Sequence, residues 1–164
     1  MLESFEVELT RLIDTEKLGN ILGVTCIPGD ILCLNGDLGA GKTTLTQAIA
    51  RGLKIPSEQY VTSPSYAIMH DYKGTIPLYH MDFYRLHSSD DVIELGFEEY
   101  FYLDGITVIE WSERAFDILP VARISLEIMV QDNGTRSVLF TTQDDELAER
   151  YGNALEQYGY LKKE

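Results

Sequence analysis

Hydrophobic and polar positions alternate along some segments of the chain and gather into hydrophobic runs along others. Residues 5–9 alternate Phe, Val and Leu with glutamates, which predicts a strand at the edge of a sheet. The hydrophobic runs at 31–34 and 106–109 predict strands buried on both faces, as in a parallel sheet. The same reasoning predicts four further strands, near 66–72, 76–83, 124–128 and 137–140.

Helical spacing of hydrophobic residues and typical capping residues predict the helices. Asp14 is a favourable N-cap for a helix over about 15–23. A second helix begins near Lys42 and places its hydrophobic residues on one face. Three more helical segments are predicted, after a cap at 88–91, at 97–102 and from about 144 to 158.

One segment carries a complete phosphate-binding signature. Residues 36–43 read G-D-L-G-A-G-K-T, between the strand at 31–34 and the helix that begins near Lys42. Glycines let successive backbone N–H groups turn inward around a phosphate, and the positive end of the helix dipole adds to the attraction. Lys42 is placed to reach the β- and γ-phosphates, and the Thr43 hydroxyl to ligate Mg²⁺. This context favours a site for ATP and Mg²⁺ over a glycine-rich turn without a ligand.

Turns join the segments in an order that defines the fold class. Residues 73–75 predict a hairpin, and Asn133-Gly134 between two strand patterns is a strong hairpin signal. The elements predict an α/β fold of P-loop NTPase type, with three layers and a mostly parallel central sheet with antiparallel additions. We expect residues 1–164 to form a single domain, with residues 161–164 frayed.

The chain is strongly acidic, with 27 Asp and Glu residues, 13 Lys and Arg residues and a net charge of −14. Such a surface repels a phosphate backbone, so we expect no autonomous tight binding to nucleic acid. It also repels ATP, which makes Mg²⁺ nearly obligatory at the phosphate loop.

The remaining composition points to the cytoplasm. Cys26 and Cys33 lie in hydrophobic surroundings, which predicts buried free thiols in a reducing compartment. No hydrophobic run approaches the length of a membrane span, and the N-terminus lacks the features of a signal or transit peptide. We therefore expect a cytoplasmic protein with no membrane partner.

Two acidic residues stand at the ends of predicted strands, where open α/β sheets place their ligands. Glu110 directly follows the strand at 106–109, the position of a Walker B acid, although an ordinary strand-end carboxylate would look the same. Asp82 shares a strand face with His80, because residues two apart point the same way. We interpret Glu110 as a magnesium ligand, Asp82 as a metal ligand or the group that orients water, and His80 as a support. Lys42, Asp82 and Glu110 are the expected catalytic residues.

Two further features have two interpretations each. Residues 63–65, Ser-Pro-Ser, are either a plain turn or a switch loop that orders with the γ-phosphate. Trp111, the sole tryptophan, either packs in the core or forms an aromatic surface near the nucleotide.

Arg85 and Arg114 lie near these motifs, but neither presents itself as an internal arginine finger. Because such a finger accelerates phosphoryl transfer by about 10³ to 10⁵, we expect slow ATP turnover that a partner stimulates.

Taken together, these segments resemble one family. The phosphate loop GDLGAGKTT, VTSPSY at 61–66, LYHMDFYRL at 78–86 and IEWS at 109–112 occur in the order and spacing of TsaE. That family is the bacterial ATPase of tRNA threonylcarbamoyladenosine biosynthesis. The resemblance runs from Asp14 to about Phe140, and its H-x-D-x-Y-R and I-E-W elements are far more specific than the phosphate loop.

The resemblance implies a protein that binds ATP and Mg²⁺, hydrolyses ATP weakly alone and docks on a complex of the TsaD and TsaB proteins. That complex transfers the threonylcarbamoyl group to the adenosine beside the anticodon in tRNAs that read ANN codons. By position, Thr43 and Glu110 match the family's magnesium sites, and Asp82 matches the acid of H-x-D-x-Y-R. The complete set of expected nucleotide contacts is Thr15, Asp37, Leu38, Gly39, Ala40, Gly41, Lys42, Thr43, Thr44, Trp111 and Arg136.

Three other functions remain open on the sequence. A small-molecule kinase of the P-loop class would need an arginine-rich lid, and the arginines of this chain are dispersed. A GTPase switch would need an N-K-x-D motif, which the sequence lacks, although residues 71–74 fit D-x-x-G. A nucleotide-gated adaptor without meaningful turnover would differ in tolerating the loss of Glu110. The oligomeric state and the docking surface are not predicted.

Overall fold

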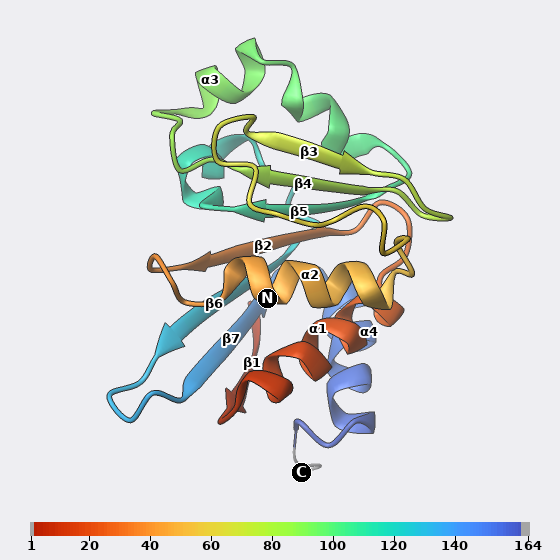
Figure 1. The fold of residues 1–164 in the computed structure, drawn as a ribbon, viewed down its shortest axis with the longest axis vertical. Helices are drawn as coiled ribbons and strands as arrows, with labels where there is room; N and C mark the ends of the chain where they lie inside the picture. Colours follow the sequence, from red (N-terminus) through yellow and green to blue (C-terminus); the bar gives the residue numbers. More distant parts are fainter. Residues whose placement is uncertain (1, 162–164) are drawn as a thin grey trace.

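The computed structural model describes residues 2–161, which form a seven-stranded mixed sheet with helices against it (Figure 1). The strands are β1 (Glu3–Leu9), β2 (Ile31–Gly36), β3 (Met69–Tyr72), β4 (Leu78–Asp82), β5 (Ile106–Glu110), β6 (Ile124–Val130) and β7 (Arg136–Thr142). The α-helices are α1 (Leu12–Thr25), α2 (Lys42–Gly52), α3 (Ser89–Glu94) and α4 (Asp145–Gln157), and the 3-10 helices are η1 (Phe97–Tyr102) and η2 (Ser112–Ile118).

The strand order is β1-β7-β6-β2-β5-β4-β3. The four central strands β6, β2, β5 and β4 run parallel, whereas β7, β1 and β3 pair antiparallel with their neighbours. The predicted α/β fold with a mostly parallel centre and antiparallel additions is therefore confirmed. The parallel strands end at one edge of the sheet, on the left in Figure 1, where the loop before α2 also lies.

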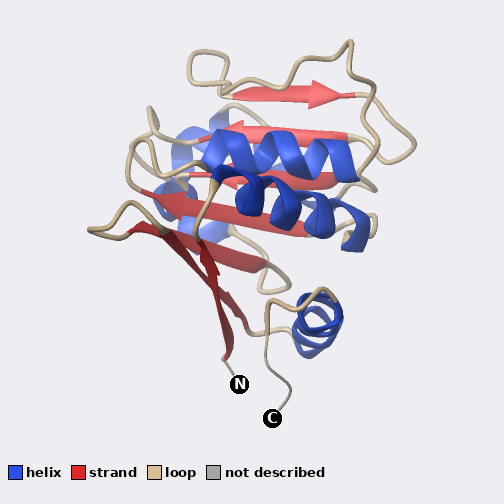
Figure 2. Ribbon diagram, turned by 60° about the horizontal axis from the view of Figure 1, so that its bottom comes forward, coloured by secondary structure: helices blue, strands red, loops and turns tan. Residues whose placement is uncertain are grey.

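Both faces of the sheet are covered, which gives the expected three layers. Helices α1 and α2 lie side by side on one face (Figure 2), and their hydrophobic residues pack with Leu32 and Leu34 of β2. Ile31 and Cys33, which alternate with them, pack with residues of α3, η1 and η2 on the opposite face. Strand β2 is thus buried on both sides, as its hydrophobic run predicts.

Glycines let α1 and α2 pack closely while running in the same direction. A Cβ atom at Gly19 would clash with Ala48, and one at Gly23 would clash with the carbonyl oxygen of Ile49. Because these contacts occur in the same order along both helices, the first turn of α1 lies beside the first turn of α2. Thr15 of α1 is therefore placed on the side of α2 where the phosphate loop ends.

Helix α1 begins earlier than its sequence predicts. Its N-cap is Arg11, and Asp14 is the third residue of the helix rather than the cap. The Asp14 carboxylate accepts a hydrogen bond from Arg11 N at 2.9 Å, so it caps the helix from inside the first turn. An aspartate near a helix start fits either position, which explains the error.

Strand β3 begins at Met69 rather than at 66. Residues 65–67 form a turn, in which the N–H of Ile68 donates to the carbonyl oxygen of Pro64. Ile68 has a φ angle of +69°, a left-handed value that is rare for a β-branched residue. The hydrophobic pattern does not reveal this reversal, which shapes the loop before β3.

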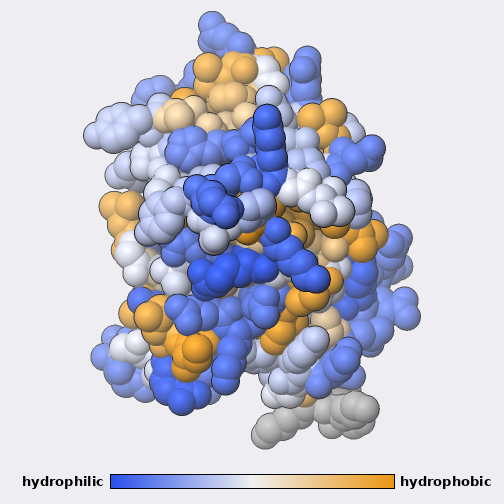
Figure 3. Space-filling model, turned by 45° about the vertical axis from the view of Figure 1, so that its right-hand side comes forward, coloured by the Kyte–Doolittle hydropathy of each residue, from blue (hydrophilic) through white to orange (hydrophobic). Residues whose placement is uncertain are grey.

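Hydrophilic residues dominate the face drawn in Figure 3, with hydrophobic ones scattered among them. At the C-terminus, Leu161 packs against the core, whereas residues 162–164, for which fraying is expected, lie outside the described residues. No helix within residues 2–161 has the length and hydrophobicity that a membrane crossing requires.

Candidate active site

The loop between β2 and α2 has the backbone that its glycines predict. Gly39 and Gly41 have φ angles of +78° and +111°, left-handed values that residues with a Cβ atom rarely adopt. Gly41 is also the N-cap residue of α2, so the loop leads directly into the positive end of the helix dipole. This combination suits an anionic ligand.

The Lys42 side chain is buried inside this loop. Its Nζ atom donates hydrogen bonds to the carbonyl oxygens of Gly36 at 2.6 Å and Asp37 at 2.9 Å. The same atom lies 4.6 Å from the centre of the Trp111 ring, which is a cation–π contact. Anionic oxygens bind an ammonium group more strongly than neutral carbonyl oxygens do, so phosphate oxygens can replace these partners.

The loop borders a cavity of about 430 Å³, a volume typical of small-ligand sites. Most of the predicted nucleotide and metal residues line it. These are Leu38, Gly39, Gly41, Lys42, Thr43, Thr44, Asp82, Glu110, Trp111 and Arg136.

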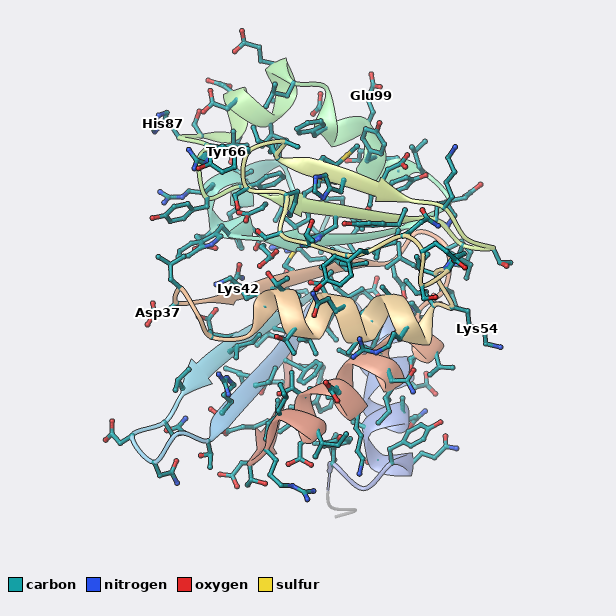
Figure 4. The ribbon with its side chains drawn as sticks, in the orientation of Figure 1. Asp37, Lys42, Lys54, Tyr66, His87 and Glu99 are labelled. Carbon is teal, nitrogen blue, oxygen red and sulfur yellow. The ribbon has the colours of Figure 1, made fainter. Side chains whose placement is uncertain are left out.

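Three predicted nucleotide contacts do not line the cavity. Asp37 lies at the outer tip of the loop (Figure 4) and contributes its carbonyl oxygen to Lys42. The carbonyl oxygen of Ala40 accepts a hydrogen bond from Nε of Arg136 at 2.7 Å, which joins β7 to the loop. Thr15 is buried in the first turn of α1.

Strands β4 and β5 bring the two candidate acids together. Asp82 and Glu110 are opposite each other in the parallel register of these strands, and both side chains are buried at the edge of the cavity. Oε2 of Glu110 lies 2.6 Å from Nε2 of His80, and His80 is fully buried. His80 therefore supports Glu110, while Oε1 of Glu110 accepts no hydrogen bond from the described residues.

Asp82 connects the sheet to the Ser-Pro-Ser segment. Its Oδ1 atom accepts a hydrogen bond from the backbone N–H of Tyr84 at 2.9 Å, and Oδ2 accepts one from the Ser63 hydroxyl at 3.1 Å. The hydroxyls of Ser63 and Ser65 lie 3.2 Å apart, and both residues line the cavity. Residues 63–65 are thus more than a plain surface turn, because they contact a candidate catalytic acid.

The donors at this edge fit a magnesium ion. The Thr43 hydroxyl and the Glu110 and Asp82 carboxylates are oxygen ligands, the type that Mg²⁺ prefers. Within residues 2–161, no group of three or more His, Cys, Asp and Glu side chains could hold a metal ion alone. Mg²⁺ usually binds through one or two carboxylates together with substrate phosphates, so a two-carboxylate site without a protein-only cage fits this ion.

The surroundings of the loop are acidic. Burial raises the pKa of Glu127 on β6 above its usual value, the negative charges of Glu113 and Asp37 raise it further, and Lys42 lowers it. Negative charge around the loop opposes the approach of a free triphosphate. This electrostatic setting favours a ligand whose charge is partly neutralised by a cation.

Comparison with known proteins agrees with this geometry. The family model for the threonylcarbamoyl adenosine biosynthesis protein TsaE matches residues 9–138. The chain belongs to the TsaE family. A Bacillus subtilis protein named tRNA threonylcarbamoyladenosine biosynthesis protein TsaE is 39% identical over 129 residues, which cover 78% of this chain and 79% of that protein.

Two further relatives support the same placement. A Treponema pallidum protein with the same TsaE name is 38% identical over 125 residues, which cover 76% of this chain and 91% of that protein. The crystal structure of YdiB from B. subtilis matches the fold with a TM-score of 0.83 at 30% sequence identity. The match covers 97% of this chain and 99% of that chain.

The structure places two further residues at the cavity. Both belong to the TsaE-like motifs, but the sequence alone does not assign them to the site. Tyr84 and Arg85 line the cavity, and their only signal is their place in the same H-x-D-x-Y-R stretch as Asp82. Trp111 packs against the core, as one of its two interpretations predicts, and its ring also contacts Lys42 of the phosphate loop. Its φ angle of +56° is left-handed, which directs the chain sharply into η2 just after Glu110.

Proposed function

We propose that this protein is a Mg²⁺-dependent ATPase that acts in tRNA threonylcarbamoyladenosine biosynthesis, with weak turnover alone and stimulation by a complex of TsaD and TsaB. One observation carries the proposal: the phosphate loop, with Lys42 and Thr43, borders the same cavity as Glu110 and Asp82. The names of the relatives support the pathway.

The chain binds the nucleotide through its phosphates. The loop N–H groups and the α2 dipole attract the β-phosphate. The Lys42 ammonium group leaves the carbonyl oxygens of Gly36 and Asp37 and donates to the β- and γ-phosphate oxygens. Arg136, which is fixed to the loop at Ala40, adds positive charge at the same side of the cavity.

Thr43 and Glu110 would hold Mg²⁺, with His80 fixing the Glu110 carboxylate. When bound, Mg²⁺ supplies positive charge that neutralises the β- and γ-phosphate oxygens. Asp82 then faces the γ-phosphate side, where its carboxylate accepts a hydrogen bond from the attacking water. The two hydrogen bonds that Asp82 already accepts, from Tyr84 and Ser63, fix its orientation for that role.

The acidic character of the chain supports a protein partner rather than direct capture of tRNA. A net charge of −14 repels the RNA backbone, so the modification reaction takes place on the partner complex. In this proposal ATP hydrolysis supports the cycle of that complex, and the chain is not itself the transferase.

The test combines phosphate release with tRNA modification. The protein is mixed with ATP, Mg²⁺, tRNA and a threonylcarbamoyl donor, with and without TsaD and TsaB, and free phosphate and modified adenosine are measured. We expect slow phosphate release alone, faster release with the partners, and loss of both products for Glu110→Ala. Phosphorylation of an added metabolite in place of phosphate release would favour the kinase. Normal tRNA modification by a Glu110→Ala protein that still binds ATP would favour the adaptor.

A further inference from the structure

We propose that Arg85 is an internal arginine finger, which stabilises the charge on the transferred phosphoryl group, and that its guanidinium rests on the Tyr66 ring until it acts. This inference rests on the ATPase activity proposed above, and it replaces the expectation from the sequence that no arginine of this chain serves as an internal finger. In the reaction, the water oxygen bonds to the γ-phosphorus while the bond from the γ-phosphorus to the β–γ bridging oxygen breaks. The electron pair of the broken bond stays on ADP, and one water proton is released as inorganic phosphate forms.

The two residues that precede Arg85 are hydrogen-bonded to the two candidate acids. The N–H of Phe83 donates to the carbonyl oxygen of Glu110, and Oδ1 of Asp82 accepts from the N–H of Tyr84. A hydrogen bond from Leu86 N to Phe83 O, 3.0 Å long, closes the turn that contains Arg85. Phe83 and Leu86 are buried, so the turn is anchored in the core on both sides of Arg85.

The side chain of Arg85, in contrast, has only a weak partner. The central guanidinium carbon lies 4.1 Å from the centre of the Tyr66 ring, and Tyr66 is 86% exposed. Exposed cation–π contacts contribute little free energy. Within residues 2–161, Arg85 forms no ion pair, although the chain carries 27 acidic residues. A guanidinium that lines the cavity without a carboxylate partner is available to an anionic ligand.

The position of Tyr66 suits this resting place. In Figure 4, Tyr66 lies near the left ends of β3 and β4, and Lys42 lies across β5 from it, at the start of α2. Arg85, which contacts the Tyr66 ring, and Lys42 both line the cavity. An arginine finger needs such a position, because it must reach the γ-phosphate that the loop and Lys42 hold.

The other arginine at the cavity has a different role. Nε of Arg136 is bound to the carbonyl oxygen of Ala40, so this side chain is part of the phosphate loop's own structure. The Tyr66 segment, in turn, is tied to Asp82 through Ser63. A change in residues 63–66 would thus reach both the water-orienting acid and the resting place of Arg85.

Single-turnover hydrolysis of ATP by the full chain, with Mg²⁺ present, tests the proposal. We expect Arg85→Ala and Arg85→Lys to lower the rate at least about 100-fold, because neither side chain offers the planar fork of donors. Both variants should bind ADP as the wild type does, but should fail to trap ADP with aluminium fluoride, a mimic of the transferred phosphoryl group. Arg51→Ala, which removes an exposed arginine at the far end of α2, is the matched control and should behave as wild type.

Tyr66→Ala separates catalysis from structure. If Arg85 only stabilises the loop through Tyr66, removing the ring should lower hydrolysis as much as removing the arginine. We expect instead that Tyr66→Ala keeps at least the wild-type rate, because it frees the guanidinium. Wild-type hydrolysis by Arg85→Ala, or equal losses in the two variants, would overturn the inference. A wild-type protein that releases no phosphate would contradict the proposed function itself.

Discussion

Nε2 of His80 and Oε2 of Glu110 lie 2.6 Å apart at the buried ends of β4 and β5. Both side chains are almost inaccessible, His80 at 0% and Glu110 at 3% exposure, so no water competes for this contact. The imidazole N–H therefore fixes one oxygen of the carboxylate, and no donor within residues 2–161 occupies the other, Oε1. The orientation of Glu110 thus explains why a histidine lies on a buried strand. This contact is at the edge of the sheet where the phosphate loop also lies.

This pair predicts the behaviour of His80 variants. Removing the imidazole by His80→Ala leaves the Glu110 carboxylate without its donor, so we expect Mg²⁺-dependent ATP hydrolysis to fall about 10- to 100-fold. His80→Gln, which can still donate an N–H, should recover part of the rate. Titration of the rate with Mg²⁺ should show a higher requirement in the alanine variant. Equal Mg²⁺ dependence in all three proteins would show that His80 has no positioning role.

We expect hydrolysis to depend on Asp82, and ATP binding to depend on the phosphate loop instead. Asp82 ends β4, whereas the phosphate loop leads into α2, so Asp82→Ala leaves the loop intact. The variant should keep ATP binding while hydrolysis drops to background. Calorimetric titration with ATP and a phosphate-release assay measure the two properties on the same sample. Full phosphate release by this variant would refute the water-orienting role.

Lys42 supplies the charge inside the phosphate loop. Lys42→Ala removes the ammonium that Gly36 and Asp37 hold, and we expect ATP binding to become undetectable in the same titration. Lys54 follows the opposite end of α2 (Figure 4) and is exposed, so Lys54→Ala is a control of equal charge. Equal loss in both variants would mean that net charge, rather than the loop, governs binding.

An ion pair between the partly buried Arg150 and the buried Asp30 holds α4 to the start of β2. The Arg150 guanidinium donates to both oxygens of Asp30, at 2.6 and 2.8 Å, and the Tyr151 hydroxyl donates to Oδ2 at 2.7 Å. Arg150→Ala leaves a buried carboxylate unpaired, so we expect the free energy of unfolding to fall by about 3 kcal/mol in urea denaturation. Glu149→Ala, an exposed change on the same helix, should have little effect. Similar losses in the two variants would contradict this role of the pair.

Both thiols should be unreactive in the folded protein. Burial raises the pKa of Cys26 to about 12 and that of Cys33 to about 11, from the usual value near 9. Because the folded pKa values exceed the unfolded ones, this contribution to stability is complete below pH 9 and is lost as the pH rises toward 11 to 12. At pH 8 we expect iodoacetamide to modify neither cysteine until urea unfolds the chain. Rapid modification of native protein would contradict the burial of these thiols.

Local sequence signals were sufficient to predict Lys42 and Glu110 as residues of the candidate site. They were not sufficient to predict the contact between Arg85 and Tyr66. The phosphate loop could be predicted because the strand, the glycines, Lys42 and the helix are consecutive, and Glu110 because it ends a buried strand. The contact between Arg85 and Tyr66 depends on the turn at 65–67 and the left-handed Ile68, which hydrophobic periodicity does not encode. The β3 boundary was wrong for the same reason. A local turn, closed by the hydrogen bond from the Ile68 N–H to the Pro64 carbonyl oxygen, overrode a strand-like pattern.

We propose that a triphosphate and Mg²⁺ bind where Lys42, Thr43 and Glu110 meet. The most direct measurement is a crystal structure of the protein with Mg²⁺ and a non-hydrolysable ATP analogue. We predict that the β- and γ-phosphates occupy the loop, that Nζ of Lys42 has moved from the carbonyl oxygens onto them, and that Thr43 and Glu110 flank the metal. A nucleotide bound elsewhere on the molecule, with Lys42 still on Gly36 and Asp37, would contradict the account.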